Sequence, residues 1–448
     1  MKSKKLFTST VIAAVLAASP MAFAAEEDAV QRTLITNANI FDGTSDKLTA
    51  PMSVLIEDNK IAKISKSIPA TSDMMVIDAQ GRTMSPGFID VHVHLTWNQG
   101  IWEFTDSPGT YVGALALVEA ENTLMRGFTT VRDTAGPSLG PKKAIDEGYF
   151  PGPRIYSSEA AIGMTSGHGD FRTLNTAPRQ FGGPALTELE LHGGSIIADG
   201  VPEVLTAARD QMRKGAHFLK IFAGGAVSGL RDPLDIMEYS MEELKAAAGE
   251  ADRWNTYVAV HAYTDRAVRE SLEAGFLSIE HANMLTEETM KLAAEKGAFI
   301  SAQTGFFLGP VPPHFNEQQA ARQIEAAEGL DTMMKMAKKY NVDIGFGTDF
   351  IGGFEAKALQ NQEFTNRLKW FTPAEIMQQA TSVNTRVLEM TGPRNPYPGK
   401  LGVIQEGAYA DILLINGNPL EDISILTKPE ENLALIMKDG EIYKNTIN

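Results

Sequence analysis

The chain has 448 residues, of which 43% are hydrophobic and 21% are charged, and it contains no cysteine. This composition is typical of a globular protein long enough for one large domain and a smaller one, and it excludes a disordered chain or a disulfide-bonded scaffold. The formal net charge of −16 argues against nucleic acid or an anionic membrane surface as a partner.

The first 24 residues have the pattern of a secretory signal peptide. Three lysines among the first five residues precede an apolar run over 11–18, and the Ala-Phe-Ala sequence at 22–24 is a typical cleavage motif. The apolar run is too short to span a bilayer comfortably. We therefore expect cleavage after Ala24, a periplasmic or secreted protein, and no membrane contact once residues 1–24 are removed.

Short strand-like runs separated by turns occupy both ends of the chain. One set lies between residues 32 and 78, and a matching set follows residue 410. Neither set is long enough to enclose a core of its own. We therefore expect residues 25–84 and 394–448 to form one composite β-domain with a sandwich-like architecture.

Residues 85–393 alternate strand-like runs with helical runs. This alternation predicts an α/β fold, a (β/α)8 TIM barrel with its active site at the C-terminal ends of the strands. A doubly wound open sheet is the alternative, but the first strand is not followed by a Gly-x-Gly-x-x-Gly turn. The predicted strands are 88–94, 129–133, 154–158, 218–222, 257–262, 278–282, 299–303 and 344–348, and the predicted helices include 111–125, 202–214, 241–253, 265–274, 287–296 and 319–340.

Two histidines project from one face of the first predicted barrel strand. Side chains alternate along a strand, so His92 and His94 share a face with Asp90. The interior of a small barrel is normally filled by aliphatic side chains, so two imidazoles on that face indicate a metal site. A pair of histidines with ordinary hydrogen-bond partners is the alternative.

Four more polar residues occupy equivalent positions on other strands, namely Lys220, His261, His281 and Asp349. An isolated buried lysine is most simply explained by an ion pair, and an isolated buried histidine by a carbonyl partner. Next to four histidines, Lys220 is better explained as a carbamate formed with CO₂, which could bridge two cations. Asp349 is either a helix N-cap or a carboxylate that accepts and returns a proton during hydrolysis.

Together these segments resemble the metal-dependent amidohydrolase superfamily. The similar segments are Pro-Gly-Phe-Ile-Asp-Val-His-Val-His at 86–94, Phe-Leu-Lys-Ile at 218–221, His261, Glu280-His281, and Gly-Thr-Asp at 347–349. The resemblance implies two divalent metal ions, with zinc as the expected ion. The implied ligands are His92 and His94 for one ion, His261 and His281 for the other, carboxylated Lys220 as the bridge, and Asp349 as ligand and proton shuttle.

Within that superfamily the chain is similar to the exported imidazolonepropionase-like group, which includes proline- and arginine-releasing dipeptidases and ochratoxin-hydrolysing amidases. The resemblance implies a binuclear hydrolase in which a metal-bridged hydroxide cleaves an amide bond of a dipeptide, an N-acyl amino acid or an aryl amide. Homo-oligomers are common among similar proteins, and we expect one here. The alternatives are a mononuclear cyclic-amide hydrolase or deaminase, with Lys220 only structural, and a non-catalytic binding scaffold.

Candidate substrate contacts come from three places in the chain. His168 lies in a long glycine-rich insert over 163–199, at the predicted catalytic face, and could contact the substrate or its oxyanion during catalysis. Tyr263 and Arg132 are candidates for binding a substrate carboxylate. His192 is a weaker candidate. The remaining two histidines, His217 and His314, are expected to be structural or exposed.

Overall fold

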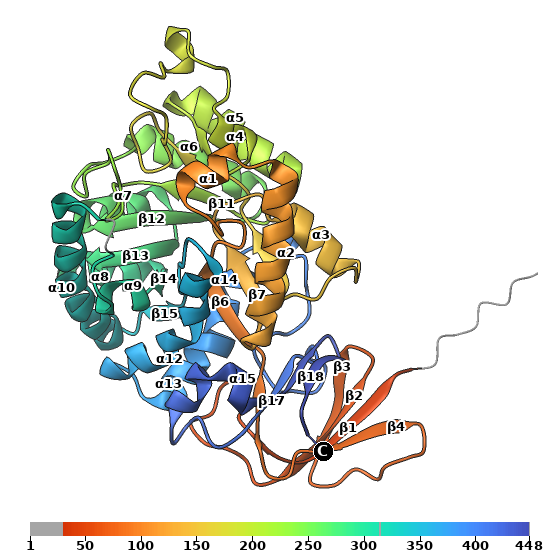
Figure 1. Ribbon diagram of the computed structural model, residues 1–448. Helices are drawn as coiled ribbons and strands as arrows, with labels where there is room; N and C mark the ends of the chain where they lie inside the picture. The colour runs from red at the N-terminus through yellow and green to blue at the C-terminus, as the bar shows by residue number, and fades with distance from the viewer. Residues whose placement is uncertain (1–29, 313–314, 448) are drawn as a thin grey trace, which may run out of the picture.

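The computed structural model describes residues 30–312 and 315–447 (Figure 1). The predicted signal peptide and His314 lie outside these ranges. In the described part of the chain, no helix is long and apolar enough to cross a membrane.

Strands from the two ends of the chain pair with each other in the lower part of Figure 1. The junction is the antiparallel pair of β5 and β16, in which Met84 is opposite Leu414. The strand order is β18-β17-β16-β5-β1-β2-β3, with β4 also paired to β1. The strands are β1 (Arg32–Ile40), β2 (Met52–Glu57), β3 (Lys60–Ser65), β4 (Met74–Asp78), β5 (Thr83–Pro86), β16 (Ile412–Ile415), β17 (Leu433–Lys438) and β18 (Glu441–Asn445).

One apolar core joins the two sets of terminal strands. Ile35 and Val54 from the N-terminal set pack with Leu414 and Leu435 from the C-terminal set, and all four are fully buried. Burial of this shared surface stabilises the pairing, because neither set alone could remove these side chains from water.

The middle of the chain contains all eight predicted strands, each within a few residues of its expected limits. They form two parallel sheets with the orders β6-β7-β8 and β10-β9-β11-β12-β13-β14-β15. The strands are β6 (Phe88–Val93), β7 (Phe128–Asp133), β8 (Arg154–Ser157), β9 (Ala161–Gly163), β10 (Ser195–Ile197), β11 (Leu219–Phe222), β12 (Val258–Thr264), β13 (Ser278–Met284), β14 (Phe299–Ala302) and β15 (Asp343–Phe346). β9, which ends at residue 163, and β10, which lies within the 163–199 region, were not predicted, because a three-residue strand is too short to show an alternating pattern.

Helices separate successive strands and surround the sheets in Figure 1. Several begin at a side-chain cap: the Ser240 and Thr264 hydroxyls, for example, accept a hydrogen bond from the first turn of α6 and α7. The helices are α1 (Ile101–Asp106), α2 (Gly109–Met125), α3 (Leu139–Asp146), α4 (Glu188–Leu191), α5 (Gly200–Lys214), α6 (Met241–Arg253), α7 (Asp265–Ala274), α8 (Glu287–Lys296), α9 (Gly305–Leu308), α10 (Glu317–Tyr340), α11 (Phe354–Lys357), α12 (Gln362–Asn366), α13 (Pro373–Gln378), α14 (Asn384–Glu389) and α15 (Pro429–Asn432).

The two parallel sheets meet at two seams that lack a regular strand ladder. At one seam, the His217 amide donates to the Ser157 carbonyl, and the Ser157 amide donates to the His217 Nδ1 atom, both at 2.9 Å. At the other, the amides of Thr348 and Asp349 donate to the His92 carbonyl at 3.3 and 2.8 Å. Individual hydrogen bonds therefore connect β8 with the residues just before β11, and the residues just after β15 with β6.

The His217 seam should make folding sensitive to acid. Burial, together with the nearby charge of Lys142, lowers the pKa of His217 from 6.5 to about 4, and the neutral ring accepts from Ser157. The neutral form is favoured only in the folded chain, so its stabilisation is complete above pH 6.5 and is lost as pH falls toward 4. We expect a loss of about 3 kcal/mol in unfolding free energy over that interval.

Urea unfolding of the wild type and of His217→Asn at pH 7 and pH 4 measures this effect. Asparagine can still accept from Ser157 but does not titrate, so the variant should lose less stability on acidification. His192→Asn, the same change at a partly exposed histidine, is the matched control. Equal acid sensitivity of wild type and His217→Asn would contradict the assignment.

Candidate metal centre

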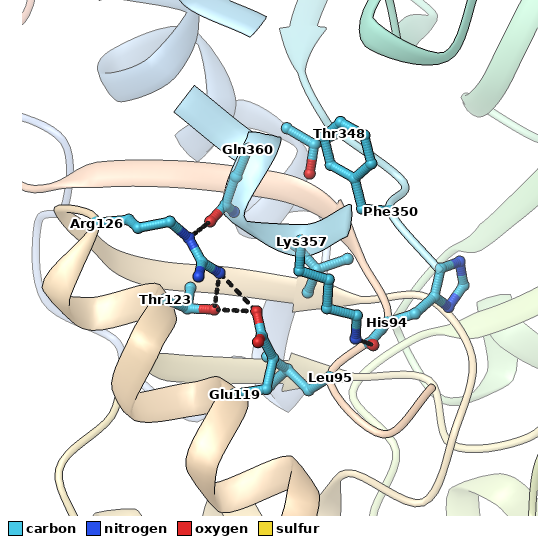
Figure 2. A pocket seen from close by; sticks show the side chains of 10 residues that line it. His94, Leu95, Glu119, Thr123, Arg126, Thr348, Phe350, Lys357 and Gln360 are labelled. Carbon is cyan, nitrogen blue, oxygen red and sulfur yellow. Dashed lines mark hydrogen bonds and ion pairs between the residues drawn. The ribbon is translucent and has the colours of Figure 1, made fainter. Parts of the chain in front are cut away.

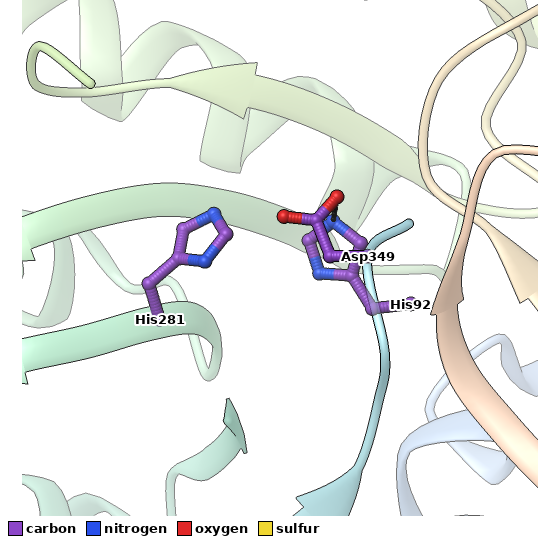
Figure 3. A group of neighbouring side chains, drawn as sticks. All are labelled: His92, His281 and Asp349. Carbon is purple, nitrogen blue, oxygen red and sulfur yellow. Dashed lines mark ion pairs between the residues drawn. The ribbon is translucent and has the colours of Figure 1, made fainter. Parts of the chain in front are cut away.

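Side chains from three separate strands meet at one end of the parallel sheets. His92 lies in β6, His281 lies in β13, and Asp349 follows β15. One nitrogen or oxygen atom from each lies within 4.8 Å of the others, and Figure 3 shows their polar ends turned toward a common space. Two histidines and a carboxylate at this spacing form a potential metal site.

The other two predicted histidine ligands adjoin this group. The His94 Nε2 atom is 2.9 Å from the Asp349 Oδ1 atom, and the His92 Nε2 atom is 3.3 Å from the same oxygen. The His261 Nδ1 atom is 3.0 Å from the His281 Nε2 atom. The structure thus brings all four histidines and Asp349 together from β6, β12, β13 and the end of β15.

Lys220 extends from β11 into the same interior and is 2% exposed. Its Nζ atom has no hydrogen-bond partner among the residues in the structure. Burial lowers the pKa of Lys220 to about 8, and its charge acts electrostatically on His92, His261 and His281. An unpaired ammonium in this position is costly, so the site suits a lysine that is converted to an anionic form.

The histidines offer free electron pairs. Burial lowers the pKa of His281 to about 3 and the pKa of His261 well below its usual value, so both imidazoles are neutral at physiological pH. The His261 Nε2 atom is buried and, like Lys220 Nζ, has no partner in the described chain. Neutral imidazoles with an unused nitrogen fit divalent metal ions.

The backbone is strained at the same strand ends. His281, Ala282 and Asp349 have φ values of 76°, 57° and 57°, a left-handed conformation that costs non-glycine residues of the order of 1–3 kcal/mol each. Such conformations cluster at functional sites. Here they turn His281 and Asp349 toward the centre.

Two buried residues that the sequence analysis assigned no role orient the histidines. The Glu280 Oε2 atom accepts from His92 Nδ1 at 2.8 Å, and the Gln303 Oε1 atom accepts from His281 Nδ1 at 2.7 Å. Burial raises the pKa of Glu280, but Arg132, His92 and Lys220 together outweigh it and keep that pKa well below its usual value. A polar residue within an apolar strand, the signal that identified Lys220, was also present at Glu280 and Gln303.

A second polar network lies behind His94, around the small cavity in Figure 2. The Lys357 Nζ atom donates to the His94 carbonyl oxygen. Nearby, Arg126 donates to Gln360 at 2.8 Å and pairs with Glu119. The Lys357 contact holds the backbone carbonyl of His94 in place.

The structure does not support the predicted substrate contact of Arg132. Its guanidinium is fully buried and donates to the Val91 carbonyl, Ser278 and Glu280, the last at 2.7 Å. No donor side of the guanidinium faces the site mouth. Arg132 instead supports Glu280 from below, because a charged side chain on an inward strand position can be enclosed rather than presented to a ligand.

The other two candidates for substrate contact lie against the centre. The His168 ring stacks on His261 with ring centroids 4.7 Å apart, and its Nδ1 atom donates to Asp232 at 3.0 Å. Tyr263 stacks on His281 at 4.5 Å. His192 contacts Phe104 instead, at 6.1 Å between ring centroids.

Comparisons with known proteins agree with this site. Residues 83–443 match the amidohydrolase family. Ochratoxinase from Aspergillus niger is 31% identical over 381 residues, covering 81% of this chain and 75% of the relative. A crystal structure of a prolidase complexed with N-methylphosphonate-L-proline has a TM-score of 0.83 at 30% identity, and one of a Xaa-Pro dipeptidase with methionine in its active site has a TM-score of 0.80 at 27% identity. Both cover 93% of this chain and all of the solved chain.

The chain therefore belongs to the amidohydrolase family, a family of metal-dependent enzymes. It is a hydrolase that acts on carbon–nitrogen bonds, in the group that includes ochratoxinase and the Xaa-Pro dipeptidases. The solved relatives imply a TIM barrel with a separate β-domain, in agreement with the strand order.

Gly347 provides a direct test of how tightly this centre is packed. A Cβ atom at that position would lie 2.6 Å from the Ser301 Oγ atom and 2.9 Å from the His92 Cβ atom. Gly347→Ala should displace His92 from Asp349, at a cost of about 1–3 kcal/mol in stability, and should weaken metal retention by about tenfold or more.

Metal content per chain after dialysis, together with thermal unfolding, measures both effects. Gly140→Ala is the matched control, because a Cβ atom there meets nothing within 4 Å. Retention equal to that of the control would show that this close approach does not determine the geometry.

Proposed function

We propose that the protein is a binuclear metal-dependent amidase that releases an amino acid from dipeptides or N-acyl amino acids. The observation that carries the proposal is the pair of buried, unpartnered nitrogens, Lys220 Nζ and His261 Nε2, beside three more histidines and Asp349. Polar atoms are rarely left unpaired in a protein interior unless something else binds them. The names of the relatives support the same class of substrate.

Each residue has a defined task in this proposal. His92 and His94 would hold one ion and His261 and His281 the other. Lys220, with a pKa of about 8, is neutral in an appreciable fraction of molecules, and its Nζ atom can add to CO₂ and lose a proton to give an anionic carbamate between them. The ions, with zinc as the proposed identity, would polarise the amide carbonyl and lower the pKa of a water.

Asp349 is suited to move the proton. Burial opposes its charge, but the charge and hydrogen bond of His92 hold the pKa of Asp349 well below its usual value, so it is ionised and can accept. Its side chain keeps 23% exposure, which places it at the open side of the centre. There it can receive the proton of the attacking water and deliver it to the departing amine.

A cleft beside His168 favours an apolar substituent on the substrate. It has a volume of about 260 Å³ and is bordered by Gly169 and Phe171, one and three residues after His168 in the chain. Trp102, Leu186 and Leu189 contribute apolar surface to its walls. We therefore include aryl amides such as ochratoxin among the proposed substrates.

Three further properties belong to the proposal. The two parallel sheets close into one (β/α)8 barrel through their hydrogen-bonded seams. The chain is exported, with cleavage after Ala24, which would appear as a mature N-terminus at residue 25 by intact mass. It assembles as a homo-oligomer, which light scattering on the purified protein would test.

The decisive variant is Lys220→Met. We expect wild type reconstituted with zinc and bicarbonate to hold two ions per chain and to release amine from a panel of dipeptides and N-acyl amino acids. Lys220→Met should lose at least one ion and lower kcat/KM by about 100-fold or more. Metal analysis and a ninhydrin assay measure the two quantities.

Lys438→Met is the matched control. Lys438 is also buried, but it lies at the end of β17 in the β-domain, and its Nζ atom donates at 2.9 Å to the carbonyl of Gly152, in the loop before β8. Two ions and full activity in Lys220→Met would refute the bridging role. One ion in the wild type would favour the mononuclear alternative.

Asp349→Asn tests the proton shuttle separately. We expect kcat to fall by about 10²–10⁴-fold for alkyl amides, because asparagine cannot carry the proton. An anilide with an electron-poor leaving group needs less protonation and should lose less. An equal loss for both substrates, or undiminished turnover with metal still bound, would contradict the role.

A further inference from the structure

The two pairs of histidines are oriented by groups of different charge. On one side, the His92 Nδ1 atom donates to the Glu280 carboxylate at 2.8 Å. On the other, the His281 Nδ1 atom donates to the Gln303 amide oxygen at 2.7 Å. All four residues are buried, so neither hydrogen bond competes with bulk water. In both rings Nδ1 carries the proton, so the electron pair is on Nε2, which lies 3.3 Å from Asp349 Oδ1 in His92 and 3.0 Å from His261 Nδ1 in His281.

The neighbouring hydrogen bonds also determine that Glu280 is charged and that the Gln303 oxygen, not its nitrogen, faces His281. Glu280 must be an anion, because its Oε1 atom accepts from the buried Arg132 guanidinium at 2.7 Å. The Gln303 amide cannot be flipped without loss, because its Nε2 atom donates to the Ser301 carbonyl at 3.0 Å and to the Ser301 Oγ atom at 3.1 Å. Gln303 therefore presents its neutral oxygen to His281. Its Nε2 atom also lies 3.2 Å from His92 Nδ1, a longer contact than the 2.8 Å from that nitrogen to Glu280.

The other contacts of the four histidines differ between the two pairs in the same way. Asp349 contacts His92 and His94, at 3.3 and 2.9 Å. His261 contacts His281 and has no carboxylate partner among the residues that the structure describes. The carboxylate contacts of 3.3 Å or less are thus made to His92 and His94, whereas Asp349 approaches His281 only to within 4.8 Å.

This arrangement has an electronic consequence. An imidazole whose N–H donates to a carboxylate is a stronger electron-pair donor than one whose N–H donates to a neutral amide, because the nearby negative charge stabilises the positive charge that the ring acquires on binding a cation. Loss of such an orienting partner typically lowers metal affinity by about 10–100-fold. The difference between Glu280 and Gln303 should therefore be visible in binding.

We propose that the two metal positions are unequal, with a tightly held ion at His92 and His94 and a readily exchanged ion at His261 and His281. Glu280 and Gln303 are the positioning residues that set this order. The proposal rests on the binuclear centre proposed above. It adds that one ion can be removed or replaced while the other stays.

The experiment uses zinc-loaded holoenzyme titrated with a chromophoric chelator, and counts ions released per chain. Wild type should lose its first ion at a free chelator concentration about tenfold or more below that needed for the second. Gln303→Glu should raise the affinity of the weak position by about tenfold and bring the two steps together. Glu280→Gln should weaken the tight position and also bring them together.

Gln303→Glu is the more informative of the two variants, because a structural disturbance alone would not increase metal affinity. Glu280→Gln leaves Arg132 without its buried counter-charge and could impair folding, in which case Gln303→Glu decides alone. Glu250→Gln is the matched control for losing a carboxylate that pairs with arginine. Glu250 pairs with Arg209 on α5, away from the histidines, and its variant should release zinc as wild type does.

The outcomes separate this inference from the proposed function. Two ions released together from wild type, or an unchanged weak step in Gln303→Glu, would overturn the inequality and leave the binuclear enzyme intact. One ion or none in fully reconstituted wild type would overturn the binuclear centre itself. Stepwise release that Gln303→Glu abolishes would establish the inequality.

Discussion

The buried carboxylate of Glu280 is the constraint on which the geometry of this site depends. An unpaired charge in a protein interior costs several kcal/mol, so Glu280 requires both the Arg132 guanidinium and the His92 imidazole. These three residues come from β13, β7 and β6. Their ion pair therefore ties the relative positions of three strands to the direction of the His92 ring, and with it to the position of Asp349.

The fold and the site are linked a second time at the seam between β15 and β6. The Thr348 and Asp349 amides that donate to the His92 carbonyl connect the two parallel sheets, and they also bring the Asp349 carboxylate to His92 and His94. The left-handed backbone at Asp349 is retained because these bonds outweigh its strain. A change that loosens this seam would disturb both Asp349 and the contact between the two parallel sheets.

Sequence patterns identified the strands well, but they identified the roles of only some of the buried polar residues. The positions of His92, His94, Lys220, His261 and His281 followed from alternation and from the rule that barrel chemistry lies at strand ends. The same signal misled at Arg132, which was assigned to the substrate but lies beneath Glu280. Alternation indicates which way a side chain points but not how deeply it is enclosed. In the sequence, a metal ligand, a residue that orients a ligand and a residue that contacts substrate therefore have the same pattern.

The sequence by itself determined the order of elements, the pairing of the two chain ends through their lack of separate cores, and a set of candidate metal-binding side chains. These properties depend on local periodicity and on residue chemistry, both of which are written in the chain. Only the tertiary structure decided that Lys220 Nζ and His261 Nε2 lack partners, that His92 donates to Glu280 and His281 to Gln303, and that His168 from a long insert stacks on His261. Those facts arise from contacts between residues tens to hundreds of positions apart, whose distances follow from packing and not from any pattern along the chain.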